Sequence, residues 1–243
     1  KSFTEPIIDF GGEVVQFTWR PRAGGNKKLI RILNELDKRA DEIDAANEKV
    51  VQRLVSGDPV LRDVRPAFEL IPELNTDEKI ILHAGPPIKW ENMTGPMQGS
   101  CIGASIFEGW AETREEAREQ LENGEVTFIP CHHVGAVGPM GGITTKNFPM
   151  VLVVNETDTS EEGSRGLSIM NEGIGEVLRF GANSDNVVNR LKWMRDVLGP
   201  VLGKAVRTFE EGMNLNVMIA RSIGMGDEFH QRNIAASLVF LKE

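Results

Sequence analysis

The chain contains 243 residues, of which 40% are hydrophobic and 26% are charged, so it can bury the core of one large domain or of two small ones. Its formal net charge of -9 argues against a nucleic-acid or anionic-membrane surface, because both need a basic field. Tyrosine is absent, which excludes a tyrosine general acid.

The cysteine content and the absence of long apolar runs bear on the cellular compartment. No run approaches the ~20 apolar residues that span a bilayer, and we expect no membrane association. Two cysteines, one of them beside two histidines, suit a reducing compartment better than a disulfide framework, so we expect a cytoplasmic protein. The chain opens without an initiator Met or a signal peptide, from which we expect a processed or trimmed chain.

The amino-terminal segment carries the first candidate anion site. Residues 14–19 alternate well enough to predict a strand, and the turn that follows contains Arg20, Arg22 and two glycines just before a predicted helix. Guanidiniums bind carboxylate or phosphate through paired hydrogen bonds, which makes Arg20 and Arg22 candidate ligands for a small anion. A solvated loop explains the same turn equally well.

Apolar spacing predicts the elements that follow. Residues 29–54 have helical spacing that is interrupted at the acidic residues 41–44. Gly99, Gly103 and Ala104 would let either a neighbouring backbone or a ligand approach a helix that begins near Pro96. Strands are expected at 60–64, 80–82, 126–129 and 150–154. Helices are expected at 113–122, 176–180, 184–198 and 215–223, together with a last helix that ends at Leu241. Pro200 is expected to kink or end the helix at 184–198.

The stretch from Pro130 to Pro149 is the principal candidate site. It places His132 and His133 directly after a predicted strand. A loop that contains four glycines follows, Gly135, Gly138, Gly141 and Gly142. Backbone N–H groups of such a loop can approach a bound anion because no Cβ intervenes. Imidazoles add proton transfer, although adjacent histidines on an extended segment are expected to point to opposite sides.

Other residues are candidates with an ordinary structural alternative. His83 ends a predicted strand ahead of the rigid turn Ala84-Gly85-Pro86-Pro87, where either a catalytic group or a hydrogen-bonded structural histidine would fit. Asn171 and Glu172 open a glycine-rich segment before a predicted helix start, which is a weak anion-binding signal. Cys131 is explained as a buried small apolar residue.

A metal site is a weaker alternative. His132 could share a zinc ion with Asp227, Glu228 and His230 across space, but their spacing matches no metal signature. We therefore favour general acid–base chemistry or plain hydrogen bonding for the histidines, and we expect no cofactor.

The order of the predicted elements indicates an α/β fold with a mixed or parallel sheet, flanking helices and a helical carboxyl-terminal extension. We expect residues 1–170 to form the α/β domain that carries the histidine and glycine loop. Residues 171–243 would then form the helical extension.

An ordered set of motifs resembles one known family over nearly the whole chain, the AllG (YlbE-like) family. The motifs are Trp19-Arg20-Pro21, His83-Ala84-Gly85-Pro86-Pro87, Gly95-Pro96-Met97, Pro130-Cys131-His132-His133 through Gly138-Pro139-Met140, Asn171-Glu172-Gly173, Arg195-Asp196-Val197-Leu198 and Gly226-Asp227-Glu228. The resemblance implies that this chain is the amino-terminal half of a protein about twice as long, with site residues in the other half out of view.

The resemblance also implies a subunit of oxamate carbamoyltransferase in anaerobic allantoin (purine) breakdown, which transfers a carbamoyl group from carbamoyl phosphate to oxamate with other subunits of the pathway. A small anionic substrate needs guanidiniums or N–H groups, for which Arg20, Arg22, Gly138, Gly141, Gly142, Asn171 and Glu172 are the candidates. His132, His133 and His83 would face the developing negative charge. The Ser-x-Arg-Thr signature of the aspartate and ornithine carbamoyltransferases is absent.

Two other functions remain open: a non-catalytic ligand-binding or scaffold subunit, and a metal-dependent hydrolase. In each case an acidic subunit with glycine-rich packing surfaces is expected to form homo-oligomers.

Overall fold

The computed structural model describes residues 3–138, 142–158, 160, 164–173, 175–229 and 233–243. The chain divides into two compact units, Lys1–Ser56 and Gly57–Glu243, and each is described by itself.

The first unit consists of helices and irregular chain. Its elements are α1 (Thr4–Asp9), η1 (Arg22–Gly25), α2 (Lys27–Asp37) and α3 (Ala40–Val55). Asn26 begins α2 by accepting hydrogen bonds from the backbone N–H groups of Lys28 and Leu29. The break between α2 and α3 lies at residues 38–39, just ahead of the acidic cluster at which we predicted it.

The prediction of a strand at residues 14–19 is wrong. This segment has no regular structure, and no described strand pairs with it. An alternating pattern is stable as a strand only when a neighbour takes up its backbone hydrogen bonds. The unit also has no buried residue among those described, so the apolar side chains of the segment have no core to face.

Two mixed sheets form the framework of the second unit, which confirms the predicted α/β class. In the five-stranded sheet the order is β4-β7-β6-β1-β8, with β1 paired antiparallel to both β6 and β8. In the three-stranded sheet β2 lies between β3, which is parallel to it, and β5, which is antiparallel. The strands are β1 (Pro59–Pro66), β2 (Ile80–His83), β3 (Thr127–Pro130), β4 (Ala136–Val137), β5 (Ile143–Thr144), β6 (Pro149–Asn155), β7 (Arg165–Ile169) and β8 (Met213–Asn214).

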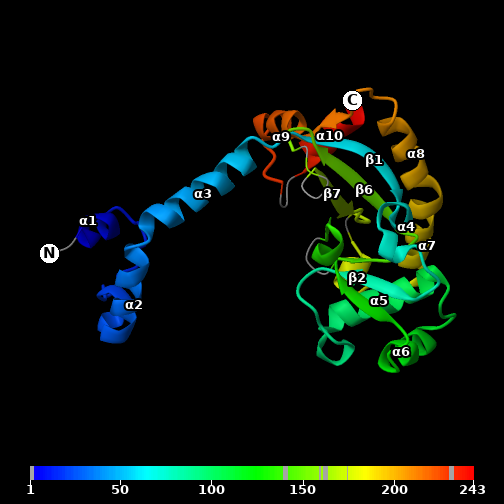
Figure 1. Cartoon of the computed structure of the whole chain (residues 1–243), viewed down its shortest axis with the longest axis horizontal. Helices are drawn as coiled ribbons and strands as arrows, with labels where there is room; N and C mark the ends of the chain where they lie inside the picture. Colours follow the sequence, from blue (N-terminus) through cyan, green and yellow to red (C-terminus); the bar gives the residue numbers. More distant parts are fainter. Residues whose placement is uncertain (1–2, 139–141, 159, 161–163, 174, 230–232) are drawn as a thin grey trace. The chain divides into compact units, whose positions relative to one another are not determined.

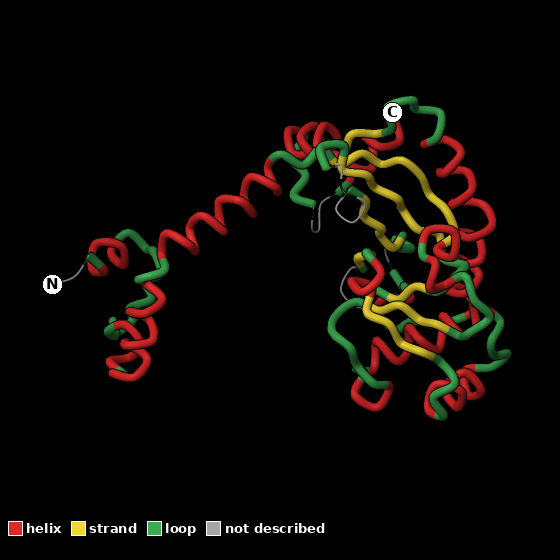
Figure 2. Tube along the Cα trace, viewed as in Figure 1, coloured by secondary structure: helices red, strands yellow, loops and turns green. Residues whose placement is uncertain are grey.

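Helices accompany both sheets (Figure 2), and the chain ends in helical structure as predicted. They are α4 (Ala67–Leu70), η2 (Pro72–Leu74), η3 (Trp90–Asn92), α5 (Gly95–Glu108), α6 (Arg114–Glu122), η4 (Cys131–Val134), η5 (Leu178–Phe180), α7 (Asp185–Trp193), a π turn η6 (Met194–Leu198), α8 (Gly199–Val206), α9 (Leu215–Gly224) and α10 (Ile234–Lys242). Among the described helices, none combines the length and apolarity needed to cross a bilayer.

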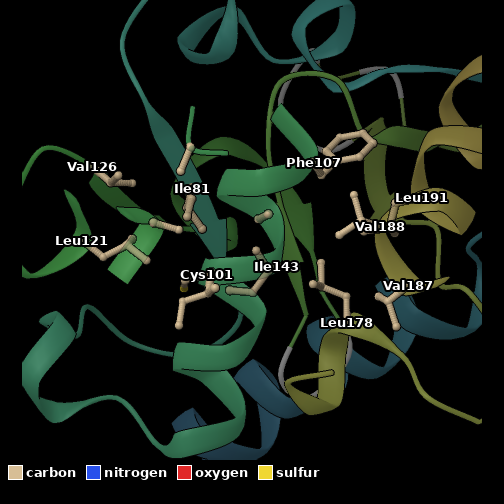
Figure 3. Packing of buried hydrophobic residues seen from close by; sticks show 14 of the residues in the cluster. Ile81, Cys101, Phe107, Leu121, Val126, Ile143, Leu178, Val187, Val188 and Leu191 are labelled. Carbon is tan, nitrogen blue, oxygen red and sulfur yellow. The ribbon is translucent and has the colours of Figure 1, made fainter. Parts of the chain in front are cut away.

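Helix α5 is the centre of the largest core cluster (Figure 3). Cys101 and Phe107 of α5 pack with Ile81 of β2 and with Val188 and Leu191 of α7. Gly99 and Gly103 of α5 allow close packing. A Cβ on Gly99 would lie 2.3 Å from the carbonyl oxygen of Gly181, so only glycine permits this contact with the loop that follows η5.

The predicted helix at 176–180 is the single 3₁₀ turn η5. Its first N–H, on Leu178, donates to the Glu172 carboxylate at 2.5 Å, and Val177 before it is extended.

The segment α7–η6–α8 is one continuous helical rod, and α8 lies alongside β1 and β6 (Figure 1). The prediction that Pro200 kinks or ends this helix is therefore wrong. A π turn precedes the proline, which then occupies the first turn of α8, where a missing N–H costs little.

Candidate functional site

The end of β2 joins the two turns that the sequence singled out. His83, the last residue of β2, pairs with Pro130 at the end of β3 on one side and with Ile143 of β5 on the other. The parallel pairing of β2 with β3 puts both carboxyl ends at one edge. The histidine-bearing turns after these strands are therefore neighbours, as expected for loops at strand tips.

One ring nitrogen of His83 has a hydrogen-bond partner among the described residues, and the other has none. The side chain is fully buried, and its Nδ1 lies 3.0 Å from the carbonyl oxygen of Ala84, which fixes Nδ1 as the N–H donor. Its Nε2 is buried without a hydrogen-bond partner among the described residues, as is the hydroxyl of Thr144 on the adjacent strand. An unpaired buried acceptor costs roughly 1–3 kcal/mol. A functional role is one explanation for a buried nitrogen that has no hydrogen-bond partner.

His132 and His133 contact each other, contrary to the prediction that they point to opposite sides. They lie on the 3₁₀ turn η4, where successive residues are about 120° apart rather than 180°. Their rings meet edge to face with centroids 4.6 Å apart, and both side chains are exposed. They form an accessible imidazole pair.

Two of the four glycines, Gly138 and Gly142, lie close to the end of β2. The Ala84 N–H donates to the carbonyl oxygen of Gly142 at 3.0 Å, and a Cβ on Gly138 would lie 3.6 Å from both the Ala84 Cβ and the Cys131 Sγ. Gly138 and Gly142 are therefore close to the His83 turn. Gly141 lies outside the described residues.

Both cysteines are buried thiols. Burial raises the pKa of Cys131 to about 11 and that of Cys101 to about 12, from an ordinary value of 9.0. Cys131 therefore stays protonated at neutral pH, and its position beside the histidines gives it no nucleophilic role.

The two predicted anion-binding arginines lie in the first unit. The guanidinium of Arg22 makes a paired contact with the Asp37 carboxylate, with N–O distances of 2.6 and 2.9 Å. This hydrogen bonding raises the pKa of Arg22 and lowers that of Asp37. Arg20 is exposed. A pocket shared by Arg20, Arg22 and the histidines of the second unit stays a prediction.

The remaining predicted residues have structural partners or no described position. Glu172 holds the start of η5, and Asn171 precedes it half-buried. Asp227 accepts hydrogen bonds from the N–H groups of Ala235 and Ala236 in the first turn of α10. Within the described ranges, no three His, Cys, Asp or Glu residues gather where they could hold a metal ion, and His230 lies outside those ranges.

An arginine-lined cavity is the feature that sequence reasoning missed. The cavity has a volume of about 410 Å³ and is lined by three guanidiniums, those of Arg65, Arg195 and Arg207, together with Glu69 and Asn147. The arginines come from the end of β1, the π turn and the residue after α8. The only sequence signals were an arginine at a strand end and the motif that begins at Arg195, because convergence of positions so far apart is a property of the fold.

Asp63 orients two of the three arginines. Its carboxylate, 4% exposed, receives Arg65 Nε at 2.6 Å on one oxygen and Arg207 Nη1 on the other, and it also accepts the Val64 N–H. A Cβ on Gly203 would lie 3.1 Å from both the Asp63 oxygen and the Arg207 guanidinium. The close approach of α8 to β1 at this glycine makes the contact possible.

Arg195 is oriented separately. Its guanidinium makes a paired contact with Asp196, with N–O distances of 2.6 and 2.9 Å, and its Cζ lies 5.3 Å from the centroid of the Phe107 ring. The Asp196 hydrogen bond raises the pKa of Arg195, and the charge of Glu108 adds to this. The cation over the ring is therefore permanent.

Comparisons with known proteins confirm the family resemblance. Residues 126–243 match the family model described as oxamate carbamoyltransferase subunit AllG. A relative from Escherichia coli (strain K12) with that same description is 53% identical over 197 residues, which make up 81% of this chain and 46% of the relative. The uncharacterized protein YahG from the same strain is 40% identical over 232 residues, covering 95% of this chain and 48% of the relative.

A solved structure is also similar. The crystal structure of a conserved protein of unknown function from Enterococcus faecalis V583 matches with a TM-score of 0.76 and 42% identity, over 83% of this chain and 46% of that chain. This chain therefore spans about half the length of the curated relatives that it matches.

Proposed function

Because residues 126–243 match the AllG family model and a relative of that description is 53% identical, we propose that this chain is a subunit of an oxamate carbamoyltransferase-like enzyme. The observation that carries the proposal is the 53% identity over 81% of the chain to a relative of that description. The proposed reaction joins carbamoyl phosphate and oxamate to give oxalurate and phosphate. It runs with other subunits of a cytoplasmic allantoin-degrading pathway as partners.

The chemistry of the transfer sets demands on the site. The amide nitrogen of oxamate attacks the carbamoyl carbon, the C–O bond to phosphate breaks, and a proton leaves the attacking nitrogen. A base must accept that proton, and N–H donors must stabilise the negative charge that develops on the carbamoyl carbonyl oxygen.

The imidazoles at the carboxyl ends of β2 and β3 suit these roles. The Nε2 of His83 carries the lone pair once Nδ1 is committed to Ala84, so it is the proposed proton acceptor. His132 and His133 are exposed on the neighbouring turn and are the proposed donors to the oxyanion. The backbone N–H groups of Gly138 and Gly142, two residues that lie beside Ala84, are proposed to assist.

Carbamoyl transfer to oxamate, measured with the full-length subunit and its partner subunits present, tests the proposal. We expect His83→Asn, in which the amide nitrogen can replace Nδ1–H but nothing replaces Nε2, to lower kcat by about 10²–10⁴-fold. The double variant His132→Ala/His133→Ala should lose activity over a similar range.

Val137→Ala provides the control, because this exposed residue of β4 lies near the same turn and carries no imidazole. Full activity in both histidine variants would remove the histidines from the mechanism. Absence of carbamoyl transfer in the complete complex would refute the proposed reaction itself.

The alternative of a scaffold subunit predicts a different result. An assembled complex that keeps full activity with every candidate side chain of this chain replaced would establish it. The metal-dependent hydrolase has less support, because the Asp227 carboxylate is already engaged by the first turn of α10. The domain boundary near residue 170 and homo-oligomerisation stay predictions.

A further inference from the structure

We propose that the cavity lined by Arg65, Arg195 and Arg207 is a binding site for a small oxyanion, either a phosphate or a carboxylate. The proposal rests on the geometry of the cavity and does not depend on carbamoyl transfer.

Convergence of two guanidiniums is the first argument. The Asp63 carboxylate is shared by Arg65 and Arg207 and brings these two like charges together at one wall of the cavity. Glu69 lies 4.0 Å from Arg65, and Asp196 pairs with Arg195, so the three guanidiniums are balanced by three carboxylates. A bound anion would therefore be held by the converging guanidinium donors and not by a net excess of charge.

The donors that remain on the guanidiniums are the second argument. The Asp63 carboxylate accepts hydrogen bonds from Nε of Arg65 and from Nη1 of Arg207. The Asp196 carboxylate accepts hydrogen bonds from Nε and Nη2 of Arg195. In the part of the chain that the structure describes, Nη2 of Arg65 and of Arg207 and Nη1 of Arg195 make no hydrogen bond. Each guanidinium is thus fixed by a carboxylate on one edge and keeps donors on another, which is the arrangement that oxyanion recognition needs.

The backbone around the cavity is built for close packing. A Cβ on Gly199 would lie 2.9 Å from the Pro149 Cβ, and one on Gly203 would lie 2.3 Å from the Val64 carbonyl oxygen. These glycines are four residues apart on one face of α8, so the helix can approach both β1 and β6. A π turn, which in proteins is frequently found at functional sites, supplies Arg195.

Glu69 sets the selectivity of the site. Its Oε2 lies 4.0 Å from Arg65 Nη1, beyond hydrogen-bonding distance, and its side chain is 44% exposed at the cavity. A second carboxylate repels a fully ionised ligand and accepts a hydrogen bond from one that carries a proton. The site should therefore prefer hydrogen phosphate species or a carboxylate bearing an N–H or O–H group.

Isothermal titration of the protein with two probes, inorganic phosphate and oxamate, tests the proposal at low ionic strength. We expect saturable binding of at least one probe, weakened by added potassium chloride. Binding of phosphate alone assigns a phosphate site, binding of oxamate alone assigns a carboxylate site, and binding of both assigns a general oxyanion site.

Three variants locate the binding. Arg195→Gln and Arg207→Gln should each weaken it about ten-fold or more, because each removes a charge-assisted hydrogen bond. Glu69→Gln should strengthen it, an increase that a merely destabilised protein would not show. Arg118→Gln on α6 is the matched control, since Arg118 pairs with Glu122 away from the cavity.

Circular dichroism and the melting temperature of each variant show that it is folded. Arg195→Gln is the safest of the charge-removing variants, because its ion-pair partner Asp196 is exposed. The proposal is overturned if neither probe binds at tens of millimolar, or if the folded arginine variants bind like the parent protein.

Discussion

Burial decides the chemistry of both cysteines. Cys101 lies inside the α5 core cluster, and Cys131 begins η4 beside the histidine pair. Burial raises the pKa of each thiol and so disfavours its thiolate. The sequence predicts Cys131 as a buried small apolar residue, and the structure confirms this, since the residue is buried.

We predict that neither thiol reacts with an aromatic disulfide reagent in the folded protein at pH 8. Unfolding in guanidinium chloride should release both, and the coloured thiolate product measures the number. Rapid reaction of one equivalent before unfolding would contradict the burial of the thiols.

The same pKa shifts predict a pH dependence of stability. Above pH 9 the unfolded chain loses thiol protons that the folded chain retains up to about pH 11 to 12. The free energy of unfolding should therefore fall as the pH rises through this range. Denaturant melts at pH 8 and pH 10 measure the fall, which should be smaller in Cys101→Ala because one of the two thiols is gone.

Sequence reasoning found the side chains that lie near each other along the chain or at strand ends. His83, His132 and Gly138 stood out because they occupy turns next to apolar runs, and strand pairing brings those turns together. The arginine cavity could not be found this way. Arg65 and Arg207 meet only through Asp63, which reads in the sequence as an ordinary polar residue of a strand.

Most regular elements were predictable, including α2 and α3, which have no buried residue among those described. The strands β1, β2, β3 and β6 and the helices α5, α6 and α9 lie within a few residues of their expected positions, since each buries apolar side chains or packs against those that do. The failures at residues 14–19 and at Pro200 share one cause. In each case the structural context outweighed the local sequence propensity. Residues 14–19 have no described strand to pair with, and a π turn before Pro200 lets the helix continue.

Helix α5 allows a matched test of close packing. Gly99→Ala would place a Cβ 2.3 Å from a backbone oxygen, whereas a Cβ on Gly95, at the start of the same helix, would have no atom within 4 Å. We predict that Gly99→Ala lowers the free energy of unfolding by about 1–3 kcal/mol. Gly95→Ala should change it by less than about 1 kcal/mol.

Chemical denaturation of the two variants measures these differences. Equal stability of Gly99→Ala and the parent protein would show that α5 and the loop after η5 can separate without cost. That result would reopen the interpretation that the small residues of α5 serve a ligand.

The two units of the molecule differ in how they are stabilised. The second unit contains three hydrophobic clusters, while the described residues of the first include none that is buried. Apolar side chains on one face of α2, such as Leu29, Ile32 and Leu36, are about half exposed. Two helices without a core contribute little hydrophobic free energy to their own folding.

We predict that a shortened chain of residues 57–243 melts within a few degrees of the full chain, because every core cluster is retained. Differential scanning calorimetry of the two chains measures this. A large fall in melting temperature would show that the helices α2 and α3 stabilise the second unit.

The π turn between α7 and α8 has a consequence for the geometry of the whole second unit. One residue more per turn advances the helical phase by about 100°, so the two ends of a straight rod present differently oriented sides. The α7 end inserts Val187 and Leu191 into the cluster around α5, and the α8 end lays Gly199 against β6 and Gly203 against β1. Deleting one residue from this turn should therefore rotate Arg207 away from Asp63 while leaving α7 in place, so the residue spacing along the rod sets how α8 lies against β1.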